Sequence, residues 1–255
     1  MTGIPKSLRV AFVVVMFVAL TGAVAQGALV KIGPLILHAD GGFTPTVLPK
    51  KKFAPIDFHG SAEVEREDGA APPALEHAVL DFDRDGRLSS GGLAKCPAET
   101  IASATPEQAR ALCSGAIVGK GHLEGLVTLP GGGTIQTKSP LTIFNGPRLQ
   151  GNPTVILHAQ FTTPAVETFA VVVPIERKLG RYAYQAAIDV PPIAGGLGAL
   201  THVDVRIGRR YIAAGVKRSY VSARCGDGIL ETRGTFTFAD GTVIAGNVDG
   251  FCRTR

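Results

Sequence analysis

The chain has 255 residues, of which 45% are hydrophobic and 18% are charged, and its formal net charge at pH 7 is +5. This mildly basic balance does not indicate nucleic acid as a partner, because nucleic-acid-binding proteins concentrate Lys and Arg far more strongly. The sequence contains no Trp and only four Tyr residues, so the exposed aromatic platforms that usually bind carbohydrate are scarce.

The first 25 residues have the three parts of a secretory signal peptide. Lys6 and Arg9 are basic, residues 10–20 are mostly apolar, and residues 23–25 form a cleavage site of small side chains. The alternative is an uncleaved membrane anchor, although the apolar block is short for a bilayer. We therefore expect a secreted protein that starts near Gln26 and has no later membrane span.

An extended entry segment at residues 26–55 is expected to precede a single β domain at residues 56–255. The clearest strand signal is at residues 200–207, where apolar and polar side chains alternate, as in a strand with one buried and one solvated face. Successive strands are predicted at residues 154–161, 167–174, 182–190, 200–207 and 216–225. Short strands separated by Gly, Pro and Asp turns predict an all-β fold, either an antiparallel β-sandwich or a partly open β-barrel.

One short helix is predicted at residues 106–113. Thr105 is its N-cap, Pro106 occupies the first helical position, and Gln108 completes a capping box. An isolated helix of this length is marginal in water, so it needs an attachment to the rest of the domain.

Four Cys residues in an exported chain predict two disulfides. Three pairings are possible, and Cys96–Cys113 with Cys225–Cys252 is favoured because each pair brackets a local unit. Each bridge would stabilise the fold by about 3 kcal/mol on the chain-entropy model. A zinc site is the competing interpretation, but these spacings lack the Cys-x2-Cys knuckle that such sites use.

The sharpest chemical signal is a D-x-D-x-D-G run formed by Asp81, Asp83, Asp85 and Gly86. Carboxylates at alternate positions before a Gly match the first half of a calcium-binding loop. The second half departs from that pattern, because Gly92 occupies the position of the bidentate Glu. The alternative is a β-hairpin turn on Asp85-Gly86. A calcium ion here would be structural, and no other cofactor is expected.

Two further sets of side chains are candidates for binding or catalysis. His158 and His202 lie on the polar faces of predicted strands and could approach each other. A hydrolase would need a cleft in which one of them meets a carboxylate of shifted pKa. Arg206, Arg210 and Arg218 belong to the most concentrated positive region and could form an anion-binding face. For both sets, a solvated sheet face is the simpler interpretation.

Three other motifs are interpreted as structural. Lys50, Lys51 and Lys52 are expected in a solvated loop, with an anionic envelope contact as the alternative. Glu63, Glu65 and Glu67 are expected on the wet face of an edge strand. The glycine-rich residues 115–121 lack the spacing of a phosphate-binding loop, and their flanks have strand patterns.

Several short phrases, taken together, resemble a group of uncharacterised exported proteins from high-GC actinobacteria. They are Leu48-Pro49 with Ala54-Pro55, Gly91-Gly92-Leu93 before Cys96-Pro97, Phe144-Asn145-Gly146, Asp189-Val190-Pro191 with Ile193-Ala194-Gly195-Gly196, and Cys225 with residues 236–252. The resemblance implies an exported compartment and an all-β fold. It implies no activity and assigns no functional residue.

The sequence alone therefore predicts a non-enzymatic structural or binding module of the cell envelope or extracellular space. Its partner would be an envelope or extracellular component, which the residues do not identify. A secreted hydrolase acting on envelope material and a barrel-shaped carrier of an apolar ligand are the alternatives. A polar cleft would favour the hydrolase, a dry interior pocket the carrier, and a filled core the module.

Overall fold

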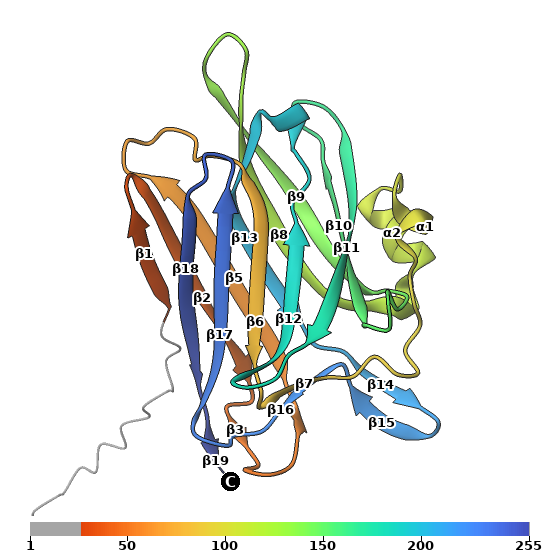
Figure 1. Ribbon diagram of the computed structural model, residues 1–255. Helices are drawn as coiled ribbons and strands as arrows, with labels where there is room; N and C mark the ends of the chain where they lie inside the picture. The colour runs from red at the N-terminus through yellow and green to blue at the C-terminus, as the bar shows by residue number, and fades with distance from the viewer. Residues whose placement is uncertain (1–26, 255) are drawn as a thin grey trace, which may run out of the picture.

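The structure, a computed structural model, describes residues 27–254; the predicted signal peptide at residues 1–25 lies outside them. Twelve of the described strands form one antiparallel sheet that curls until it is nearly closed (Figure 1). Their order in the sheet is β1 (Ala28–Ile32), β2 (Leu35–Thr44), β5 (Asp57–Arg66), β13 (Gly198–Ile207), β8 (Ile117–Thr128), β9 (Thr134–Asn145), β10 (Thr154–Phe161), β11 (Glu167–Arg177), β12 (Tyr182–Asp189), β6 (Leu75–Asp83), β17 (Ile229–Phe238) and β18 (Val243–Phe251). The predicted all-β fold is confirmed, and it takes the form of a nearly closed sheet.

The two edges of this sheet meet through side chains rather than through hydrogen bonds. β18 lies against β1 and β2, and a Cβ atom placed on Gly246 would lie 3.2 Å from side-chain atoms of both Ala28 and Val30. Inside the sheet, Leu37 of β2 belongs to the same buried cluster as Ile244 of β18. Burial of apolar surface therefore holds the edges together.

The interior is filled by apolar side chains from opposite walls. Phe58 of β5 and Phe82 of β6 meet edge to face with their ring centroids 5.9 Å apart, although seven steps of the strand order separate β5 from β6. The predicted inner face of residues 200–207 is confirmed, because Val205 and Ile207 pack against the largest core cluster.

Residues 27–55 form part of the sheet, which differs from the expected extended entry segment. β1 and β2 lie within that range, and β2 pairs with β5 in unbroken register from Leu35 opposite Arg66 to Thr44 opposite Asp57. Leu35, Leu37 and Phe43 are buried at alternate positions, but the scattered Gly and Pro residues obscure this alternation in the sequence.

β13 joins parts of the sheet that are far apart in the chain, because it pairs with β5 on one side and with β8 on the other. The inner face of β8 carries Gly119, Gly121 and Gly125. A Cβ atom on Gly121 would lie 2.0 Å from the carbonyl oxygen of Asp204, and one on Gly119 would lie 2.6 Å from that of Arg206. Only glycine allows the two strands to approach so closely where the sheet bends.

Short strands gather at one end of the sheet, at the bottom of Figure 1, which we call the lower end. They are β4 (Ala54–Pro55), β16 (Val221–Ala223) and β7 (Gly86–Leu88) in one small sheet, β3 (Val47–Leu48) with β19 (Arg253–Thr254), and the hairpin of β14 (Arg210–Ala213) and β15 (Val216–Ser219). The predicted single strand at 216–225 is therefore wrong, because it divides at the buried Tyr220 into β15 and β16. The Cys225–Cys252 disulfide lies in the core cluster of this end.

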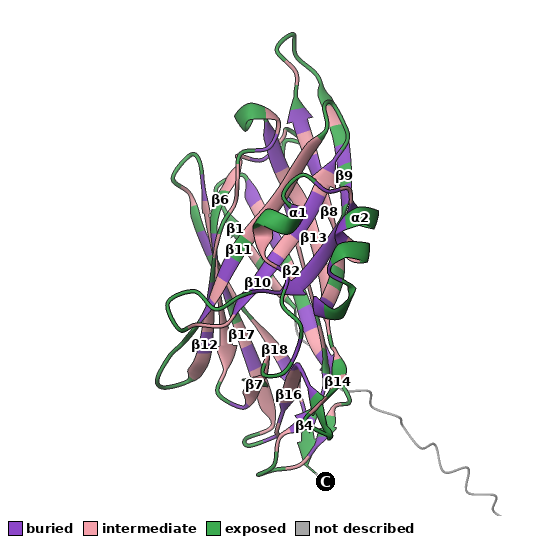
Figure 2. Ribbon diagram, turned by 90° about the vertical axis from the view of Figure 1, so that its right-hand side faces the viewer, coloured by how far each residue is buried: buried purple, intermediate pink, exposed green. Residues whose placement is uncertain are grey.

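A small helical cap covers the outer face of β9 and β10 (Figure 2). It consists of α1 (Ala98–Ile101), α2 (Pro106–Leu112) and a 3-10 turn (Ser114–Ala116), and the Cys96–Cys113 disulfide bridges it. The predicted capping box is present: Thr105 Oγ1 accepts a hydrogen bond from the backbone N–H of Gln108, whose side chain accepts one from Thr105. Within residues 27–254, no helix has the length and apolar character to cross a membrane.

We predict that Gly121→Ala lowers the free energy of unfolding by about 1–3 kcal/mol, because its Cβ would force β8 away from β13. Urea denaturation followed by circular dichroism measures the change. Gly131→Ala is the matched control, because nothing lies within 4 Å of the added Cβ, and it should change stability by less than about 1 kcal/mol. Equal effects of the two substitutions would contradict the close-approach argument.

Candidate functional site

The outer surface of β2, β5, β13, β8 and the Lys138 end of β9, beyond the part of β9 that the helical cap covers, is a polar surface that we call the histidine face. Strand register places five ionisable side chains side by side in one row across it: His38, Glu63, His202, Glu124 and Lys138. Histidine and carboxylate alternate along this central row. Each strand pairs with its neighbours, so the spacing of the row is fixed by the sheet at about 4.8 Å per strand.

A shallow depression of about 420 Å³ lies on the histidine face beside β1. His38, Asp40, Glu63 and His202 contribute to its lining, together with Ser61. The depression thus presents imidazole, carboxylate and hydroxyl groups to solvent. Such a lining offers hydrogen-bond donors and acceptors to a polar ligand, and Ala28, Leu29 and Ala39 add apolar surface beside them.

Glu124 is the most firmly held member of the central row. Lys138 Nζ donates to it at 2.8 Å, and His122 Nε2 lies 3.5 Å from the same oxygen atom. The hydrogen bond from Lys138 lowers the pKa of Glu124 below its ordinary value, with the nearby charge of His202 contributing. Glu124 is therefore ionised at neutral pH, as a binding group would be, and is a poor general base.

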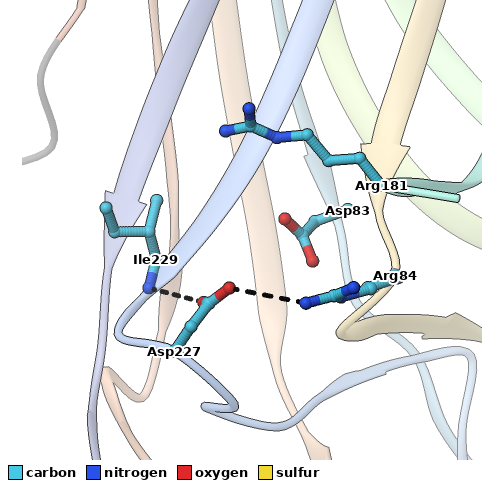
Figure 3. Close-up of a pocket in the computed structure, with 5 residues that line it drawn as sticks. All are labelled: Asp83, Arg84, Arg181, Asp227 and Ile229. Atoms are coloured by element: carbon cyan, nitrogen blue, oxygen red, sulfur yellow. Dashed lines mark hydrogen bonds and ion pairs between the residues drawn. The ribbon is translucent and has the colours of Figure 1, made fainter.

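A second polar site lies where β6, β12 and β17 reach the lower end. It is a pocket of about 380 Å³, and Figure 3 shows Asp83 lying between Arg181 and Arg84. Asp227 accepts a hydrogen bond from the backbone N–H of Ile229 and lies 3.9 Å from Arg84. Among the residues that the structure describes, none that lines this pocket carries a hydroxyl, thiol or imidazole group, so its lining contains no Ser-His or Cys-His pair.

A buried carboxylate, Glu231, lies next to this pocket. Arg181 and the hydroxyl of Tyr182 both donate to its side chain, and its backbone N–H donates to Asp83 at 3.3 Å. Burial and the hydrogen bond to Glu231 raise the pKa of Tyr182 to about 12. Burial also raises the pKa of Asp83 above its ordinary value, against two backbone hydrogen bonds.

The three carboxylates of the D-x-D-x-D-G run are held by separate partners. Asp81 accepts from the Gln185 side chain, Asp83 from two backbone N–H groups, and the buried Asp85 from Arg224. Within residues 27–254, no three His, Cys, Asp or Glu side chains are grouped to hold a metal ion. The alternative of a β-hairpin on Asp85-Gly86 is wrong, because β6 pairs with β12 and β17 while β7 pairs with β16. The calcium site stays a prediction.

The predicted anion-binding arginines do not share a face. Arg206 lies on the histidine face of β13, opposite His59. Arg210 is held by Asp57 and the carbonyl oxygen of Ile56. Arg218 is exposed on the other side of the β14–β15 hairpin, because strand alternation turns it away from Ser219, the cross-strand partner of Arg210.

His158 and His202 do not meet, because β8 and β9 lie between their strands. The helical cap covers His158, whose Nε2 donates to the carbonyl oxygen of Ala104 at 3.1 Å. Within residues 27–254 its Nδ1 has no hydrogen-bond partner, and burial lowers its pKa below the ordinary value for histidine. His158 is therefore a core residue beneath the cap, whereas His202 belongs to the central row.

Sequence reasoning did not identify the Glu231 cluster or the central row. A break in register between Tyr182 and Tyr184 turns Tyr182 to the outer face. Simple alternation would instead place both rings on one side of the strand. The row depends on β13 lying between β5 and β8, which no local pattern specifies. Glu63 was noted as part of an acidic stripe, but its two His neighbours come from distant segments.

These features define a disulfide-bridged, nearly closed antiparallel sheet with a helical cap on one outer face and a polar surface on another. Comparisons with protein-family models, with curated proteins and with solved structures found no match. The resemblance to exported actinobacterial proteins therefore stays a prediction, and the function is inferred from the residues themselves.

We predict that Tyr182 ionises with a pKa of about 12 and that Glu231→Gln lowers this value part of the way towards 10. The substitution removes the negative charge that opposes tyrosinate, whereas burial of the ring remains. Alkaline absorbance titration, with Tyr182→Phe used to assign the signal, measures the pKa. Because the folded-state pKa is raised, the stability that it contributes is present below pH 10 and is lost as the pH rises through about 12. A Tyr182 pKa near 10 in the unaltered protein would contradict the buried contact; Glu99→Gln in α1 is the control.

We predict that stability falls as the pH drops below 6.5, in part through His158. Its folded-state pKa is lowered, so the unfolded chain takes up the proton first and unfolding is favoured on the acid side. His158→Gln should flatten the dependence of the unfolding free energy on pH between about pH 7 and pH 5. Ile101→Val, in the same cap, should lower stability by about 0.5–1.5 kcal/mol at every pH. An unchanged pH dependence in His158→Gln would refute the assignment.

Proposed function

We propose that this chain is an exported, non-catalytic binding module that presents the histidine face to a polar polymer of the cell envelope. The observation that carries the proposal is the central row of alternating imidazole and carboxylate groups. A sheet holds such groups at fixed spacing and orientation, so a partner meets them without a further loss of conformational freedom.

The shape of the histidine face supports an extended partner over a small one. The depression beside β1 is shallow, and the central row continues beyond it across β8 and β9 to Lys138. A small ligand is usually enclosed in a concave, mostly apolar pocket. A hydrated polymer can instead lie across the strands and exchange hydrogen bonds with successive side chains.

The interior gives less support to an apolar-ligand carrier, because the contact of Phe58 with Phe82 bridges opposite walls. A hydrolase was expected to bring His158 or His202 to a carboxylate of shifted pKa in a cleft. His158 lies under the cap. Glu124, a carboxylate beside His202, has a lowered pKa and is therefore a poor general base. The two disulfides, Cys96–Cys113 and Cys225–Cys252, support an oxidising compartment.

The test is co-sedimentation of the purified, oxidised protein with lipid-free, insoluble envelope material from the source organism. Glu63→Gln with Glu124→Gln removes both carboxylates of the central row at nearly constant side-chain size. We expect the double substitution to weaken binding by about tenfold or more, since each hydrogen bond to a charged group contributes about 1.5–3 kcal/mol.

The control is Glu99→Gln with Glu176→Gln, which removes the same charge from exposed positions outside the histidine face. Equal binding by the two double variants would count against the histidine face as the contact surface. Failure of the unaltered protein to sediment with the envelope polymer would refute the proposal that such a polymer is its partner.

A further inference from the structure

The β14–β15 hairpin projects from the lower end as a separate two-stranded unit (Figure 1). Its four cross-strand pairs run from Arg210 opposite Ser219 to Ala213 opposite Val216. Ala214 and Gly215 form the two-residue turn and have φ angles of 50° and 73°. Left-handed backbone at both positions is the mark of a tight type I′ turn, so the tip is narrow.

The tip of the hairpin is apolar and exposed. Ile212 and Val216 are 68% and 55% exposed, and the intervening Ala213, Ala214 and Gly215 carry no charge. Two exposed β-branched side chains at the end of a projecting hairpin are available to a partner. The tip is nevertheless far smaller than the roughly 800 Å² that each partner buries in a typical protein–protein interface.

Basic side chains follow directly behind this tip. Lys217 and Arg218 are exposed, and within residues 27–254 neither side chain has an ion pair or a hydrogen bond. No acidic residue occurs in the sequence between Asp204 and Asp227. The positive charge beside the tip is therefore not neutralised locally.

A second basic segment lies at the same end of the molecule. Lys50, Lys51 and Lys52 are exposed in the loop between β3 and β4. β4 pairs with β16, which follows the hairpin closely in the chain. Figure 2 places β4, β14 and β16 at the lower end, and Figure 1 places β14 and β16 there. Two segments distant in sequence thus bring their positive charge to one end.

The hairpin is fixed at its base, which keeps the tip directed away from the core. Tyr211 Oη lies 3.0 Å from the carbonyl oxygen of Ser89, and Arg210 donates to the carbonyl oxygen of Ile56 at 3.0 Å. Ala213 lies against Gly92: a Cβ atom added to Gly92 would lie 2.5 Å from the Cβ atom of Ala213. These contacts hold Ile212 and Val216 in a fixed position from which they can insert into a partner surface.

From these observations we infer that the lower end docks on an anionic lipid surface. Ile212 and Val216 enter the boundary between headgroups and acyl chains, as the apolar residues of interfacial segments do. Lys217, Arg218 and the three lysines of the β3–β4 loop contact the lipid phosphates. This surface is separate from the histidine face, so the inference does not depend on the proposed function.

The experiment is co-sedimentation of the full mature chain with phosphatidylcholine vesicles that contain or lack phosphatidylglycerol. We expect binding to the anionic vesicles, little binding to the neutral ones, and release by high salt, because screening weakens the attraction. Ile212→Thr with Val216→Thr keeps β-branching and should weaken binding by about tenfold or more. Lys217→Gln with Arg218→Gln, a second and independent variant, should weaken it by roughly tenfold.

The matched control is Leu112→Thr with Val166→Thr, which removes exposed apolar side chains from α2 and from the turn between β10 and β11. It should bind as the unaltered protein does. Equal binding by the tip variant, or equal binding to both kinds of vesicle, would overturn the inference. A change in oligomeric state of the tip variant without vesicles would overturn it in favour of self-association.

Discussion

The close approach of β8 and β13 is the constraint on which the rest of the structure depends. β13 is the only hydrogen-bonded link, within residues 27–254, between the β1–β2–β5 group and β8. Gly119 and Gly121 allow it, because a side chain at either position would collide with the carbonyl oxygens of β13. The same pairing creates the central row, since it places His202 between Glu63 and Glu124. Fold and proposed binding surface therefore depend on the same glycines.

Elements that depend on local chemistry could be predicted from the sequence. The strand at 154–161 agrees with β10 at both ends, and the capping box at Thr105 is present. Both disulfides join residues that bracket a local unit, and both favoured pairings are formed. Each of these features is decided by residues close together in the chain, so alternation, capping and loop length were sufficient.

Features that depend on distant strands could not be predicted in this way. The D-x-D-x-D-G run has the composition of a metal loop, but Arg224, far along the chain, pairs with Asp85. The glycine-rich residues 115–121 run from the 3-10 turn into β8, and the role of Gly119 and Gly121 is evident only with β13 beside them. Tyr182 faces Glu231 because of one break in register. Side-chain alternation alone would place its ring on the same face as that of Tyr184.

The seam between β18 and β1 has a consequence for the dynamics of the molecule. Hydrogen-bonded ladders join all neighbouring strands in the order from β1 to β18, but no ladder joins β18 to β1 among the described residues. Side-chain contacts such as those around Gly246 hold this seam together. Apolar contacts without a ladder separate at a lower free-energy cost than paired strands, so local opening should begin here. The nearly closed sheet should therefore open locally along the β18–β1 seam, while the hydrogen-bonded β8–β13 pair stays intact.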